Sequence, residues 1–107
     1  MDPTIELLKE MRGRVAVYVG SNSITLLATF LGGFVYALEK YGLAQNAQFL
    51  PAFQKMVAAR YGVQIPKAWE EIIRFHSSGE NEAIDIFWRL FDEFLEGESK
   101  QGIRVTP

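Results

Sequence analysis

The feature that most constrains this chain is the stretch from Ser77 to Gly97, in which apolar side chains recur at the spacing of an α-helix. At about 100° per residue these side chains fall on one side, which the fold has to bury. The apolar set comprises Ile84, Ile86, Phe87, Trp88, Leu90, Phe91, Phe94 and Leu95. Ser77 or Ser78 is suited to the N-cap, and Gly97 is suited to the residue that follows the last turn. The stretch therefore predicts one long amphipathic helix that packs against the core.

The opposite sector of this helix is acidic. It carries Glu82, Asp85, Arg89, Asp92, Glu93 and Glu96. Five carboxylates face one guanidinium, which leaves a local net charge of −4. Such a face is most often solvated surface. The functional alternative, which we adopt as a hypothesis, is a partner-binding surface that attracts a basic protein by charge.

Four further helices are predicted from apolar periodicity and from Pro and Gly punctuation, at about 4–11, 24–41, 48–61 and 66–76. The helix over 24–41 is apolar almost all round, so we expect it in the interior as the packing partner of the acidic helix. Gly32 and Gly33 would let another helix approach it closely. The chain of 107 residues suits a single domain over 1–107, a compact bundle of about five helices.

Residues 15–19 are expected to form either an extended connector or a short strand that pairs with residues 103–105. Residues 15–19 alternate and are rich in β-branched side chains, and residues 103–105 form the one comparable run. A lone strand cannot satisfy its own backbone, so these two segments would have to pair with each other. Otherwise residues 98–107 are expected to form a loose tail.

A membrane span is not favoured, although residues 15–38 are 24 consecutive residues without charge. The polar cluster at 20–23 interrupts them and leaves about 15 apolar residues, the length of a buried core helix. The acidic start of the chain does not resemble a signal peptide, and the chain contains no cysteine. We expect a cytoplasmic protein without a membrane contact.

Catalytic chemistry finds little support in the sequence. His76 is the single histidine, and it lies on the same helix side as Trp69 and Ile72, as a packed histidine would. Ser77 follows it, but neighbours in sequence rarely form a catalytic pair, and helix capping accounts for this serine better. The glycines do not form a phosphate-binding loop, and we expect no metal and no cofactor. The net charge of −2 also argues against direct nucleic-acid binding. We therefore expect a protein that is not an enzyme.

The order of motifs resembles a family of small bacterial immunity proteins, which protect cells from contact-dependent growth inhibition and related polymorphic toxins. The motifs are Ile5-x-x-Leu8-Lys9, Arg14-x-x-x-Tyr18-Val19-Gly20-Ser21-x-Ser23-Ile24, Phe30-Leu31-x-Gly33, Ala37-Leu38, Phe53, Tyr61-Gly62, Trp69-x-x-Ile72-Ile73, Glu82-Ala83 and Phe87-x-x-Leu90-Phe91-Asp92-Glu93-Phe94. They span residues 4–96, nearly the whole chain. The resemblance implies a cytoplasmic antidote that binds a cognate toxin domain, often a nuclease, and blocks its active site. It implies no catalytic residues and transfers no binding residues.

The sequence thus predicts an immunity protein whose acidic helix covers the basic cleft of a toxin nuclease. The alternative is a small homodimerising helical scaffold, in which apolar surface of the helix at 24–41 or 48–61 packs against a second copy.

Overall fold

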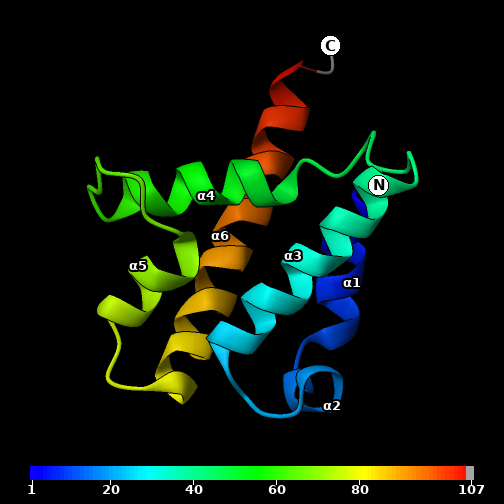
Figure 1. The fold of residues 1–107 in the computed structure, drawn as a ribbon. Coiled ribbons are helices and arrows are strands. Elements are labelled where there is room, and N and C mark those ends of the chain that lie inside the picture. Colours follow the sequence, from blue (N-terminus) through cyan, green and yellow to red (C-terminus); the bar gives the residue numbers. More distant parts are fainter. Residues whose placement is uncertain (106–107) are drawn as a thin grey trace.

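The computed structural model describes the backbone of residues 1–105 and the side chains of residues 1–99 (Figure 1). Residues 1–105 form six helices and no strand, which confirms the predicted mostly helical class. The helices are α1 (Pro3–Met11), α2 (Val15–Val19), α3 (Ile24–Lys40), α4 (Phe49–Arg60), α5 (Trp69–Phe75) and α6 (Glu80–Val105).

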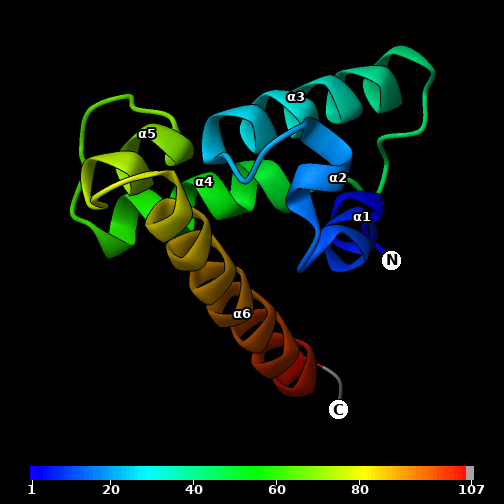
Figure 2. The ribbon, with the colours of Figure 1, turned by 90° about the horizontal axis from the view of Figure 1, so that it is seen from below.

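Helix α6 is the longest element, and α3, α4 and α5 all pack against it. In Figure 1, α4 crosses α6 and α5 lies beside both of them, while α1 and α2 lie on the other side of the molecule with α3. The view in Figure 2 shows that the C-terminal part of α6 extends beyond the other helices. The core therefore lies along the first part of α6, where the other helices meet.

An aromatic cluster occupies the centre of this core. Phe53 of α4 is fully buried, and its ring centroid lies 5.0 Å from Phe49, 5.4 Å from Trp69, 5.5 Å from Phe87 and 6.2 Å from Phe94. Three helices thus contribute rings to one cluster, mostly in the edge-to-face geometry that aromatic quadrupoles favour. The predicted burial of the apolar side of α6 is confirmed.

Asp2 joins the N-terminal ends of two helices. Its Oδ1 accepts the Thr4 N–H of α1 at 2.8 Å, as an N-cap does, while Oδ2 accepts the backbone N–H groups of Gln48 and Phe49 at 2.9 and 2.8 Å. The unpaired N–H groups at both helix starts are thereby satisfied by one carboxylate, which also interacts favourably with both helix dipoles.

A second carboxylate links α6 to α3. The Glu80 Oε1 accepts the Ile24 N–H at 2.8 Å, and the Ser23 hydroxyl accepts the Leu26 N–H at 3.1 Å. The expected contact between α3 and α6 is therefore present, and the hydrogen bond between Glu80 and Ile24 joins the N-terminal ends of the two helices.

The predicted strand over 15–19, and with it the pairing with 103–105, is wrong. Val15–Val19 forms a helix that ends at Gly20, whose φ is 97° and whose N–H donates to Ala16 O at 2.9 Å. Val15 is buried whereas Val17 is 79% exposed, which is the burial of a helical turn. Residues 103–105 belong to α6. Without a partner strand, a helical turn satisfies the backbone within the segment itself.

The prediction that the helix over 24–41 lies in the interior is also wrong. Ile24, Leu27 and Leu31 are buried, but the other side of α3 faces outward. A Cβ atom added at Gly32 or Gly33 would meet no atom within 4 Å, so neither glycine serves a close approach within the chain.

Two predicted helix ends differ as well. Helix α5 starts at Trp69, after Pro66, because the Gln54 amide holds the preceding loop: its Nε2 donates to Lys67 O and its Oε1 accepts the Trp69 N–H, both at 2.8 Å. Helix α6 continues past Gly97 to Val105. The segment predicted as a loose tail, 98–107, is thus helical as far as 105, and 106–107 lie outside the described residues. Among the described residues, no helix has both the length and the apolar character that a bilayer crossing requires.

Candidate partner-binding surface

The six residues predicted to bind a partner all lie on the outward side of α6. Glu82, Asp85, Arg89 and Glu96 are exposed, and Asp92 and Glu93 are partly buried. These six side chains therefore share one side of α6, as the helical period predicted. Their neighbours from other helices, however, change the electrostatics of the surface.

Asp92 is held by Arg12, at the C-terminal end of α1. The Arg12 Nη1 and Nη2 donate to the two carboxylate oxygens at 2.6 and 2.7 Å, the bidentate arrangement that suits a guanidinium. The same guanidinium lies 5.1 Å from the ring centroid of Trp88, within cation–π range. The hydrogen bond from Arg12 holds the pKa of Asp92 below its ordinary value, and the pKa of Arg12 is raised by the same bond.

Two further carboxylates of the set are engaged within the chain. Arg60 of α4 donates to the Glu93 Oε2 at 3.4 Å, and Ser78 donates its backbone N–H to the Glu82 Oε1 at 2.5 Å. That backbone hydrogen bond, with a smaller contribution from the Ser78 side chain, holds the pKa of Glu82 below its ordinary value. Glu82 thus caps the start of α6 in the manner of a capping-box residue.

These contacts reduce the charge that a partner would meet. The five carboxylates now face three guanidinium groups, those of Arg12, Arg60 and Arg89, so the net charge is −2 instead of −4. The sequence reasoning missed Arg12 and Arg60 because they come from other helices. The one sequence signal for Arg12 is its place four residues after Leu8, which puts it next to the buried side of α1.

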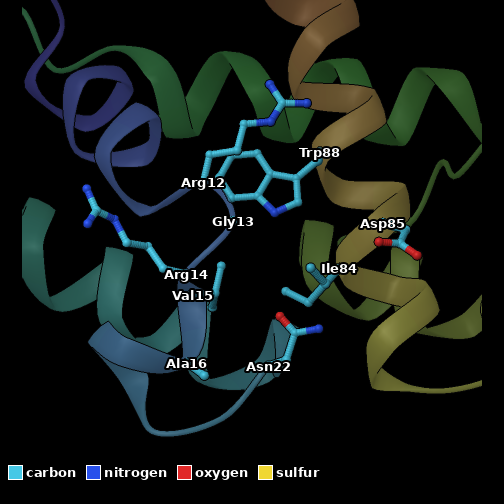
Figure 3. A pocket seen from close by; sticks show the side chains of 9 residues that line it. All are labelled: Arg12, Gly13, Arg14, Val15, Ala16, Asn22, Ile84, Asp85 and Trp88. Carbon is cyan, nitrogen blue, oxygen red and sulfur yellow. The ribbon is translucent and has the colours of Figure 1, made fainter.

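A groove adjoins this surface between the α1–α2 turn and the first half of α6. It encloses about 590 Å³, and its lining residues are Arg12, Gly13, Arg14, Val15, Ala16, Asn22, Ile84, Asp85 and Trp88 (Figure 3). The buried side chains of Val15, Ile84 and Trp88 give it an apolar floor. Figure 3 shows Asp85 on one side of the groove and Arg14 on the other.

The polar groups that line the groove differ in whether they have a partner within the chain. Arg14 donates its Nε–H to Glu10 O at 2.9 Å, and the Asn22 amide donates to the Asn81 side chain at 2.9 Å. Asp85, in contrast, has no ion-pair partner among the side chains described. An apolar floor with an accessible carboxylate at its edge is suited to receive a long basic side chain, whose stem is apolar and whose end is charged.

His76 does not belong to this surface. Its ring stacks on Tyr61 with a centroid separation of 4.3 Å, and its Nδ1 lies 3.0 Å from Ile72 O. The hydroxyl of Ser77 donates to Arg74 O at 2.9 Å. Ser77 thus makes a local contact at the end of α5, and His76 packs on Tyr61, the residue that follows α4. Among the described residues there is no group of three or more His, Cys, Asp or Glu that could hold a metal ion.

Comparisons of the chain with protein-family models, with curated proteins and with solved structures found no match.

Proposed function

We propose that this protein is an immunity protein that binds a cognate toxin domain, a basic nuclease, and covers its active-site cleft. Its binding surface is the outward side of α6 together with the groove that Asp85 borders. The proposal is supported by the accessible carboxylate of Asp85 beside an apolar floor, on a helix fixed by the aromatic core. The resemblance to immunity proteins over residues 4–96, described above, supports the same class.

The carboxylates of the surface have different roles in this proposal. Asp85 and Glu96 are exposed, and neither has an ion-pair partner among the described side chains, so they are the groups that meet the cations of the toxin. Asp92 and Glu93 already bind Arg12 and Arg60, and they mainly fix α6 to α1 and α4. The carboxylates that have a guanidinium partner within the chain are thus distinct from those that are accessible to a partner protein.

The test uses the toxic C-terminal region of a large exported protein encoded next to this chain's gene. Co-expression with this chain should restore growth of cells that produce the toxin. Asp85→Lys with Glu96→Lys should weaken binding at low salt by about tenfold or more, and added salt should reduce the difference. Glu71→Lys with Glu6→Lys is the matched control, because it changes the same charge on exposed sites of α5 and α1.

Two results would count against the proposal. If no neighbouring toxin exists, or if this chain fails to protect cells from it, the immunity function is wrong. If protection holds and the charge-reversed variant binds as tightly as the control, the function stands and the surface is wrong.

A further inference from the structure

The outward side of α3 is a helix surface without charge over most of its length. Its exposed residues are Thr25, Leu26, Thr29, Gly32, Gly33, Tyr36 and Ala37, and the first ionic side chains are Glu39 and Lys40 in the last turn. The exposed sides of α1 and α6 are, in contrast, rich in charge, as Glu6, Glu10, Asp85 and Arg89 show. An exposed helix side that remains uncharged for four turns is unusual for a surface that meets water alone.

Large apolar side chains project from this side and from the loop that follows it. Leu26 is 42% exposed and Tyr36 is 64% exposed, and Tyr41 and Leu43 are 74% and 62% exposed. Counted over two copies of the chain, these four side chains expose on the order of 1,000 Å², so an interface that covered all of them would reach the lower limit for a specific interface.

The two central glycines add a separate observation. Each weakens a helix relative to alanine, and nothing within 4 Å of their positions would hinder a Cβ atom. The chain itself therefore gives no steric reason for two glycines in the middle of α3. A helix from another molecule that crosses at this point would give one, because its backbone can approach most closely where Cβ atoms are absent.

We propose that the outward side of α3 is the interface of a two-fold symmetric homodimer, in which α3 packs antiparallel against α3 of a second copy and crosses it at Gly32–Gly33. Helix α3 has 17 residues, so Gly32 is its middle residue. A two-fold axis at this point places the N-terminal half of α3 in one copy beside the C-terminal half of α3 in the other. Tyr36 of one copy then lies over Thr29 of the other, where the small side chains leave room.

The ionic groups at the two ends of this surface can pair with those of a second copy. In the antiparallel arrangement the C-terminal end of α3, with Lys40, lies beside the N-terminal end of α3 in the other copy. Glu80 is located there, since it accepts the Ile24 N–H at 2.8 Å. Lys40 and Glu80 are exposed, and neither has an ion-pair partner among the described side chains. Glu39 shares the last turn with Lys40, so the Lys40–Glu80 pair has to outweigh a second carboxylate at the same end. The two-fold axis repeats the pair at both ends of the interface, and the dipoles of two antiparallel helices attract each other.

The mass of the full chain in solution is the first measurement, by sedimentation equilibrium over a range of concentrations. A dimer is expected, with a dissociation constant of the order of micromolar, because interfaces at the small end of the size range are mostly weak. Gly33→Leu should raise that dissociation constant about tenfold or more, because the new side chain stands where the two backbones cross. The folded monomer should remain, since leucine favours the helix and its Cβ meets no atom of the chain. Ala59→Leu on the exposed side of α4 is the control and should leave the constant unchanged.

A double-mutant cycle tests the ionic contact without loss of the helix cap. Glu80→Gln retains an acceptor for the Ile24 N–H, so its effect reports on charge alone. Lys40→Gln and Glu80→Gln should each weaken the dimer several-fold, and the double variant should be no weaker than either single one. A chain that stays monomeric up to about 1 mM overturns the proposal. A dimer that Gly33→Leu leaves intact overturns it as well, and would place the interface elsewhere.

Discussion

At the scale of the single residue, Thr4 is the least satisfied group in the described part of the chain. Its side chain is fully buried, and its Oγ1 has no hydrogen-bond partner there. The backbone N–H of the same residue is well used, since it donates to the Asp2 Oδ1 at 2.8 Å. A buried hydroxyl without a partner costs about 1–3 kcal/mol of stability.

Thr4→Val should therefore stabilise the protein. Valine has nearly the same shape and removes the unpaired hydroxyl, so we expect the free energy of unfolding to rise by about 1 kcal/mol. Thr4→Ser is the matched control: it keeps the hydroxyl and loses a buried methyl group, so it should lower the free energy of unfolding by about 1 kcal/mol. Urea unfolding of both variants measures the difference. A destabilised valine variant would show that the hydroxyl has a partner in solution.

The Arg12–Asp92 pair gives the protein a predictable acid response. The hydrogen bond from Arg12 lowers the pKa of Asp92 in the folded state, so the pair contributes stability above the pKa of the unfolded chain. That contribution is lost as the pH falls through the folded pKa, below about pH 4. Both side chains remain nearly half exposed, at 45% and 47%, and solvent screening limits the pair to about 0.5–1 kcal/mol.

Asp92→Asn should remove the stabilisation by the Arg12–Asp92 pair at pH 7. Between pH 4 and about pH 2 the variant should then lose less stability than the parent chain. Glu96→Gln removes an exposed carboxylate from the same helix and serves as the control, with an effect within about 0.5 kcal/mol. Chemical unfolding at several pH values gives both quantities. Equal acid sensitivity of Asp92→Asn and the parent would contradict the assignment.

At the scale of the element, Asp2 is the residue on which two helix starts depend. It accepts three backbone N–H groups, one from α1 and two at the start of α4. Asp2→Ala leaves all three without their acceptor and should lower the free energy of unfolding by about 2 kcal/mol, more than the usual loss of one cap. Asp2→Asn should have an intermediate effect, because its amide oxygen can serve one helix while its NH₂ group faces the donors of the other.

Thermal unfolding followed by circular dichroism checks this prediction, with Glu6→Ala in the first turn of α1 as the control. Glu6 is exposed, so its removal should change the free energy of unfolding by less than about 0.5 kcal/mol. If Asp2→Ala behaves like this control, the link between α1 and α4 does not contribute to stability.

Helices with strong apolar periodicity were predictable, and segments decided by tertiary contacts were not. The apolar repeats of α1, α3, α4 and α6 identify them from sequence alone, whereas the side chain of the N-cap residue accepts a hydrogen bond in α1 and α3 but not in α4. Residues 15–19 have the composition of a strand, and their helical form depends on the lack of a partner strand. The start of α5 depends on Gln54, which lies on another helix. A local pattern cannot contain that information.

The candidate surface was likewise predictable only in part. The outward position of Asp85 and Glu96 follows from the period of α6, so the sequence predicts it. The partial neutralisation of the surface depends on Arg12 and Arg60, which are 80 and 33 residues distant from their carboxylates in the chain. The sequence left the position of the helix at 24–41 open between the interior and a surface for a second copy, because apolar composition does not distinguish a core from an interface between molecules.

At the scale of the whole molecule, one aromatic cluster unites the elements that carry both proposed surfaces. Phe53 of α4 contacts rings of α5 and α6, and α3 packs against those two helices. The two tryptophans report on different sides of this body: Trp69 packs on Phe53, whereas Trp88 packs on Phe87 and also lies beside Arg12 at the end of α1. If the cluster holds the molecule together, its loss has to affect both parts at once.

Phe53→Ala should lower the free energy of unfolding by about 3–5 kcal/mol, since the side chain is fully buried and its removal leaves a cavity among packed rings. A domain of this size has a total stability of about 5–15 kcal/mol, so the variant should be close to unfolding at 37 °C. Phe75→Ala is the matched control: this ring is 79% exposed, and its loss should change stability by less than about 0.5 kcal/mol. In Trp69→Phe and Trp88→Phe backgrounds, fluorescence of the remaining tryptophan should report the same shifted midpoint, as an all-or-none transition requires. Separate midpoints would mean that α1 and its neighbours unfold independently of the cluster, and the surfaces on α3 and α6 would then belong to two cooperative units.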